Sequence, residues 1–134
     1  MREVVAHFRL AEIWWVQFGK NIATEVTGKG SDFLRPAVII QLVFNNACLV
    51  VPLSTKIKVG DYYFAFCDTK GMSQCANLAQ IRYVDGKRLK YKQSSIPKDA
   101  FENLREALCR LIRKNPAQER GGPQRANFCS NSTE

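Results

Sequence analysis

Residues 35–55 read RPAVIIQLVFNNACLVVPLST, and this stretch decides the fold. It holds two short apolar runs, 37–43 and 47–53, which are separated only by the tripeptide FNN. Short runs rich in β-branched residues are typical of buried strands. Asn45 and Asn46 tolerate left-handed backbone geometry, so the tripeptide predicts a tight turn. The stretch therefore predicts a β-hairpin whose two strands lie in the core.

The flanking segments predict further strands and one helix. Residues 10–18 (LAEIWWVQF) are rich in aromatic and β-branched residues and predict a strand. A second hairpin is expected to join 61–66 to 75–84, and the turn DGK at 85–87 leads into another strand at 88–93. The helix comes last, because apolar residues recur there at spacings of three and four: Phe101, Leu104, Ala107, Leu108, Leu111 and Ile112.

These elements predict a mainly β fold with a C-terminal α-helix. Short strands, regular turns and one closing helix favour a small, strongly bent antiparallel barrel with the helix over one open side. The 134 residues suit one domain. We expect an N-terminal extension at 1–9, the folded domain at 10–114 and a disordered tail at 115–134, where proline, glycine and polar residues prevail.

Composition excludes several classes of protein. No apolar stretch reaches the roughly 18 residues of a membrane helix, and the N-terminus does not have the pattern of a signal peptide, so we expect a cytoplasmic protein. The single histidine, His7, gives a zinc site or a catalytic cysteine poor prospects. We therefore expect no metal or other cofactor, and reduced, mostly buried thiols at Cys48, Cys67, Cys75, Cys109 and Cys129.

Positive charge is concentrated in the middle of the chain. The net charge is +8, and residues 54–92 hold eight Lys or Arg against three Asp. Such an excess either keeps the protein soluble or forms a surface for a polyanion such as nucleic acid. Arg35 adds a more specific signal, because Pro36 restricts the backbone next to it and a buried strand follows. A solvated surface arginine needs no such anchoring, whereas an arginine aimed at an anion benefits from it.

Several fragments, in order, resemble one known family. EIWWVQF, a glycine-rich loop ending in RPAVII, then VPLSTK, then AQIRYVDGKRL and a C-terminal amphipathic helix are similar to the MazF/PemK (Kid) toxins of bacterial type II toxin–antitoxin pairs. The resemblance covers about residues 11–113. It implies an SH3-like barrel of the MazF/PemK/CcdB type and a homodimer. It also implies a metal-independent, sequence-selective endoribonuclease that cuts single-stranded RNA and is silenced by a cognate antitoxin.

The resemblance also implies roles for individual residues. Arg35 matches the arginine at the scissile phosphate, and Ser54 matches the catalytic hydroxyl. Glu25 is the best candidate for the loop glutamate, although it lies ten residues before Arg35 where the common pattern has about five, so Asp32 is the rival acid. The residues expected to bind RNA are Thr55, Lys56, Lys58, Gln80 and Arg82.

These residue types suit RNA cleavage. RNA supplies its own nucleophile, the 2′-OH, so the protein needs a base, charge stabilisation for the phosphorane and an acid for the leaving oxygen. A desolvated glutamate and a guanidinium are the candidates here. Two other interpretations stay open: a toxin of the same fold that binds a protein such as gyrase, as CcdB proteins do, and an inactive relative that only binds RNA. Trp14 and Trp15 suit packing better than base stacking.

The tail generates the first testable prediction. Because residues after Asn115 offer little to bury and match no fragment of the family, we predict that truncation after Asn115 leaves RNA cleavage unchanged. Initial cleavage rates of the full-length and truncated proteins measure this. A large loss of rate in the truncated protein would contradict it.

Overall fold

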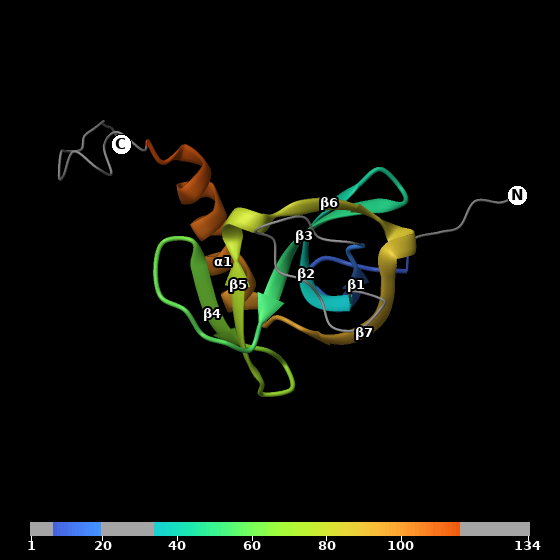
Figure 1. Ribbon diagram of the computed structural model, residues 1–134, viewed down its shortest axis with the longest axis horizontal. Helices are drawn as coiled ribbons and strands as arrows, with labels where there is room; N and C mark the ends of the chain where they lie inside the picture. Colours follow the sequence, from blue (N-terminus) through green and yellow to red (C-terminus); the bar gives the residue numbers. More distant parts are fainter. Residues whose placement is uncertain (1–6, 20–33, 116–134) are drawn as a thin grey trace, which may run out of the picture.

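The computed structural model describes residues 7–19 and 34–115. Figure 1 shows a curved sheet with one helix at its side. No helix among the described residues is long and apolar enough to cross a membrane. The loop after residue 19, the tail after Asn115, and Cys129 lie outside the described residues. The elements, in chain order, are β1 (Glu12–Gln17), β2 (Leu34–Val43), β3 (Ala47–Ser54), β4 (Tyr63–Cys67), β5 (Ser73–Asn77), η1 (Leu78–Gln80), β6 (Arg82–Asp85), η2 (Gly86–Arg88), β7 (Leu89–Ser95) and α1 (Lys98–Arg113).

The β2–β3 hairpin predicted from the sequence is confirmed, and it lies at the centre of the sheet. The strands follow the order β4-β5-β3-β2-β1-β7, all antiparallel, and β6 pairs with the start of β3. The predicted fold class is confirmed: the structure is a mostly antiparallel sheet with one C-terminal helix. The sheet is curved, but its two edge strands, β4 and β7, do not pair to close it into a barrel. Phe44 (φ 56°), not Asn45 or Asn46, adopts the left-handed conformation in the turn, so the residue assigned to that geometry was wrong.

The hairpin is buried on both faces, and each face has its own core. Side chains alternate across a strand, so Val38 and Ile40 point to one face while Ala37 and Ile39 point to the other. The first core lies between the sheet, α1 and the β4–β5 hairpin; its members include Val38, Ile40, Val51, Leu53, Phe66, Leu78, Phe101 and Leu104. The second core is enclosed by β1, β2, β3, β6 and β7; its members include Val16, Phe18, Ala37, Ile39, Cys48, Val50 and Val84.

The segment 75–84, predicted as one strand, is divided in two. β5 pairs with β4 and with the end of β3, then the turn η1 redirects the chain so that β6 pairs with the beginning of β3. Leu78 in η1 is buried in the first core, and its backbone N–H donates to the Tyr62 carbonyl at 2.8 Å. Burial of Leu78 therefore breaks the strand, an effect that the apolar pattern alone does not reveal.

The predicted helix is confirmed as α1. The Pro97 carbonyl accepts from the Phe101 N–H at 2.8 Å, which places the proline at the N-terminal cap. Phe101, Leu104 and Leu108 are buried against the first core. Ile112 is 73% exposed, so its assignment to the buried face was wrong.

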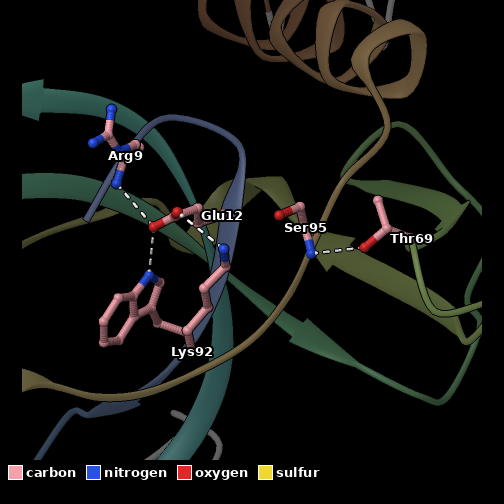
Figure 2. A network of polar contacts seen from close by, with 6 residues as sticks. Arg9, Glu12, Thr69, Lys92 and Ser95 are labelled. Carbon is pink, nitrogen blue, oxygen red and sulfur yellow. Dashed lines mark hydrogen bonds and ion pairs between the residues drawn. The ribbon is translucent and has the colours of Figure 1, made fainter. Parts of the chain in front are cut away.

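A buried carboxylate, Asp68, fastens the β4–β5 hairpin to β7. It accepts hydrogen bonds from the Lys70 and Met72 N–H groups (both 2.9 Å), from Gln74 Nε2 (3.1 Å) and from Ser94 Oγ (3.0 Å). A second link joins Thr69 to Ser95, whose backbone N–H donates to the threonine hydroxyl (Figure 2). The hairpin is therefore held to β7 by side chains as well as by the shared core.

We predict that this carboxylate makes stability depend on pH. Burial alone would raise the pKa of Asp68, but its four hydrogen bonds together lower it below the ordinary value. The stabilisation is thus complete above the unfolded-state pKa of about 4 and is lost as pH falls through the lower folded-state pKa. At pH 7, Asp68→Ala should lower the free energy of unfolding by about 3 kcal/mol in a urea titration.

The exposed Glu102→Ala variant is the control for removal of a carboxylate. Its free energy of unfolding should lie within about 0.5 kcal/mol of the wild-type value. The difference between wild type and Asp68→Ala should shrink as the pH is lowered below about 4. A difference that stays constant with pH would contradict the role given to the Asp68 charge.

Candidate active site

Arg35 is part of strand β2 and does not lie in the loop that precedes it. β2 begins at Leu34, three residues before the apolar run at 37–43, and Arg35 pairs with Val16 of β1. Alternation along β2 turns its side chain to the same face as Ala37 and Ile39, which belong to the second core. Arg35 Nη2 donates to the Leu53 carbonyl at 3.3 Å. The guanidinium is therefore hydrogen-bonded to β3, one residue before that strand ends at Ser54.

The surroundings of Arg35 leave part of its hydrogen-bonding capacity unused. The side chain is half-buried, and Nε is buried without a partner among the described residues. Burial lowers the pKa of the guanidinium from its ordinary value. An arginine nevertheless stays protonated near neutral pH, so the charge is retained at a cost in solvation. Such a group gains from an anionic acceptor that completes its hydrogen bonds.

Ser54, the last residue of β3, lies on the same face as Arg35. The pairing of β2 with β3 ends at Ala37 and Pro52, and the Arg35 guanidinium bonds to the carbonyl of Leu53, the residue before Ser54. The serine Oγ accepts a hydrogen bond from the Lys56 N–H at 3.0 Å. The hydroxyl proton remains available to donate to another group. Ser54 thus directly follows the residue whose carbonyl accepts from Arg35.

Two further arginines gather around the end of β1. Arg82 of β6 pairs with Val50, which turns it to the second-core face, and its guanidinium carbon lies 4.8 Å from the centre of the Phe18 ring. Arg88 of η2 donates from Nη1 to the Gln17 carbonyl at 3.0 Å. Residues 16–18 thus have three arginines as neighbours: Arg35 through its backbone, and Arg82 and Arg88 through their guanidinium groups. Arg88 and Phe18 were missed in the sequence, where Arg88 counted only toward net charge.

The remaining residues expected to bind RNA lie within four residues of Ser54 or of Arg82 in the sequence. Thr55, Lys56 and Lys58 are exposed in the loop that follows Ser54. Gln80 is half-buried at the end of η1, two residues before Arg82. Their positions are compatible with one extended surface, and their roles stay predictions.

Three of the described carboxylates form ion pairs with cations outside this group of arginines. Ion pairs within the described residues join Glu12 to Lys92, Glu106 to Arg110 and Asp61 to Lys114, and none involves Arg35, Arg82 or Arg88. Glu25 and Asp32, the two candidate acids, lie outside the described residues. Among the described His, Cys, Asp and Glu side chains there is no cluster of three that could hold a metal ion. The described part of the site is therefore cationic.

Trp14 is engaged in packing. Its indole Nε1 donates to Glu12 Oε1 at 2.9 Å, and its ring packs against the second core. Figure 2 shows that the Glu12 carboxylate also accepts from the Arg9 backbone and pairs with Lys92. Trp15 is half-buried on the other face, where it pairs with Pro36 and Tyr91. Packing accounts for Trp14, as the sequence suggested.

The four described cysteines divide evenly between core and surface. Cys48 and Cys75 are buried and Cys67 and Cys109 are exposed, all four without disulfides, so the expectation of mostly buried thiols holds for two of them. Burial, with the nearby Asp85 carboxylate, raises the pKa of the Cys48 thiol to about 12. That thiol is therefore unsuited to be a nucleophile.

A family model matches most of the chain. The model described as "PemK-like, MazF-like toxin of type II toxin-antitoxin system" matches residues 9–112. No curated protein sequence matches the chain.

Solved structures with the same fold are also found. An endoribonuclease from a mycobacterial species has a TM-score of 0.63 at 11% identity and covers 82% of this chain and 95% of its own. MazF from Deinococcus radiodurans has a TM-score of 0.61 at 17% identity, with 77% and 94% covered. A mycobacterial endoribonuclease in complex with its cognate antitoxin has a TM-score of 0.54 at 15% identity, with 87% and 97% covered. At these identities the likeness shows the fold.

The burial of Arg35 predicts a conflict between stability and function. Arg35→Met keeps an unbranched side chain of similar length but removes the desolvated charge, so the free energy of unfolding should rise by about 1 kcal/mol. Arg82→Met is the matched comparison and should lower it by about 0.5–1 kcal/mol, because the contact with Phe18 is lost. Urea unfolding measures both. A loss of more than about 1 kcal/mol for Arg35→Met would mean that the guanidinium serves the fold.

Proposed function

The chain belongs to the PemK-like, MazF-like toxins of type II toxin–antitoxin systems, and on this premise we propose that it is a metal-independent endoribonuclease. Its substrate is single-stranded RNA, including mRNA, which it cuts at selected sequences. The observation that carries the proposal is the placement of Arg35 and Ser54 on one face at the adjoining ends of β2 and β3. The concentration of guanidinium groups around them supports an anionic substrate.

The reaction requires little covalent chemistry from the protein. The 2′-oxygen of a ribose attacks the adjacent phosphorus while a base takes its proton. The bond from phosphorus to the 5′-oxygen then breaks, and an acid protonates the departing oxygen. The products are a 2′,3′-cyclic phosphate and a 5′-hydroxyl end. Between these steps the phosphorane carries additional negative charge, which fixed donors stabilise most.

Arg35 and Ser54 are suited to stabilise that charge. Arg35 is half-buried, and the exposed part of its guanidinium can donate to a phosphate oxygen while Nη2 bonds to the Leu53 carbonyl. The Ser54 hydroxyl already accepts from Lys56, so its proton is directed to a different acceptor, a non-bridging oxygen of the same phosphate. Strands buried on both faces hold the two donors in place before the substrate arrives.

The base is one of two carboxylates. Glu25 is the first candidate and Asp32 the second, both in the segment between β1 and β2. Partial desolvation of the residue that serves would raise its pKa toward the working pH. Arg82, Gln80, Thr55 and Lys58 bind the nucleotides that flank the cut, and Lys56 adds to the positive charge of this surface.

The proposal includes the partners that the family resemblance implies. We expect a homodimer in the cytoplasm that a cognate antitoxin silences. A solved complex of a mycobacterial endoribonuclease with its cognate antitoxin, which has this fold, supports the second partner. Exposed apolar side chains at Leu42, Phe44 and Tyr83 offer surface for such contacts.

We predict that the purified protein cuts a mixed RNA in the presence of EDTA and leaves 5′-hydroxyl ends. Arg35→Ala should lower kcat about a thousandfold and Ser54→Ala about a hundredfold, because each removes a donor to the transition state. Sequencing of the cut ends and single-turnover rates measure this. As a control, a 2′-deoxy nucleotide at the cut site should abolish cleavage.

Different outcomes separate the competing functions. Intact RNA together with trapped gyrase would favour a toxin of the CcdB type, and intact RNA with retained binding would favour an inactive relative. For the base, Glu25→Gln should remove the acidic limb of the pH–rate profile if Glu25 serves, while Asp32→Asn leaves the limb unchanged. The reverse pattern would assign the role to Asp32.

A further inference from the structure

The loop between β3 and β4, residues 55–62, holds its two lysines in different ways. It begins directly after Ser54, and both Lys56 and Lys58 are exposed. Lys56 contributes its backbone N–H to Ser54 Oγ, while its ammonium takes part in no ion pair or ring contact within the described residues. Lys58 is held at its backbone and at its ammonium. The ammonium group of Lys58 is therefore more restricted than that of Lys56, although the two carry the same charge.

The backbone of Lys58 is held by the Cys75 thiol. Cys75 Sγ accepts from the Lys58 N–H at 3.5 Å and lies 3.8 Å from the Lys58 carbonyl, to which it can donate. Cys75 is 3% exposed, so the sulfur has little access to water. On β5 it pairs directly with Ser54 of β3. The thiol thus anchors the loop next to the strand end that carries the serine hydroxyl.

The ammonium of Lys58 is held by an aromatic ring. Nζ lies 5.7 Å from the centre of the Tyr63 ring, within the range of a cation–π contact. Tyr63 is half-buried at the start of β4, where its pairing with Asn77 of β5 fixes the strand. The ring contact leaves the outward side of the ammonium free to donate, since an ammonium has three donors. Two independent contacts from one hairpin thus restrict the same lysine.

We propose that Lys58 is a pre-positioned cation that binds a backbone phosphate next to the scissile one, with Cys75 and Tyr63 as its positioning residues. The inference rests on the proposed function and deepens it by naming a phosphate subsite. A lysine already restricted by its surroundings loses less side-chain entropy when it binds than a free lysine does. Lys56 lacks that advantage, so the same charge two residues earlier contributes only to the general field.

The test compares lysines of equal charge. Binding is measured with a mixed-sequence single-stranded RNA in which every ribose is 2′-O-methylated, so that no cleavage can occur. Lys58→Ala should weaken binding about tenfold and reduce the slope of log K against log salt by about 0.7, the value for one phosphate contact on a single strand. Lys56→Ala should weaken binding less than about twofold and leave the slope nearly unchanged. Equal effects of the two substitutions would overturn the inference.

The positioning residues are tested by substitutions that keep or remove one contact. Tyr63→Phe keeps the ring and should bind as the wild type does, whereas Tyr63→Leu should weaken binding about threefold with an unchanged salt slope, because the charge is still present. Likewise Cys75→Ser keeps a donor and acceptor, and Cys75→Ala removes both. A purely structural role would lower the unfolding temperature of Tyr63→Leu and Cys75→Ala without changing their affinity, which would also overturn the inference.

Failure of this inference can be told apart from failure of the proposed function. If the wild type cleaves natural RNA but the two lysine variants bind alike, only the phosphate subsite is wrong. If the wild type cleaves nothing yet Lys58→Ala alone weakens binding, the subsite stands and the nuclease assignment falls. If the wild type does not bind the methylated RNA at all, the subsite is wrong.

Discussion

The hydrogen bond from the Arg35 guanidinium to the Leu53 carbonyl joins the beginning of β2 to the end of β3, and the rest of the site is arranged around it. Both strands are buried on two faces, so neither can shift without disturbing a core. The contact uses one donor of the guanidinium and leaves Nε buried without a partner in the described part of the chain. The proposed function accounts for such a group, because a substrate phosphate would accept further hydrogen bonds from the guanidinium.

Around this pair, each of the neighbouring elements contributes one contact to the same end of the sheet. Phe18, directly after β1, contacts Arg82 through its ring, η2 supplies Arg88, and β5 supplies the thiol that anchors the loop after Ser54. The ion pairs among the described residues join Glu12, Asp61 and Glu106 to other cations, and none of them involves Arg35, Arg82 or Arg88. An extended anionic chain suits such a surface better than a small neutral ligand, because its charges are spaced along its length.

The sequence predicted the parts of the fold that depend on local pattern. The β2–β3 hairpin and α1 were readable because apolar residues follow the period of each element over many residues. The division of 75–84 was not readable, since it depends on where Leu78 finds a buried position. For the site, Arg35 and Ser54 stood out through Pro36 and the family resemblance. Phe18, Arg88 and Cys75 gave no local signal, because their contacts cross between distant strands: Arg88 bonds to Gln17, and Cys75 to Lys58.

The central claim is that Arg35 and Ser54 act on one phosphate as a unit. A double-mutant cycle on the single-turnover rate of RNA cleavage tests it most directly, with wild type, Arg35→Ala, Ser54→Ala and the double variant. If both groups stabilise the same transition state, the double variant should be about as slow as Arg35→Ala alone, which corresponds to a coupling energy of about 2–3 kcal/mol. If the two losses multiply instead, the residues act independently and the shared site described above is wrong.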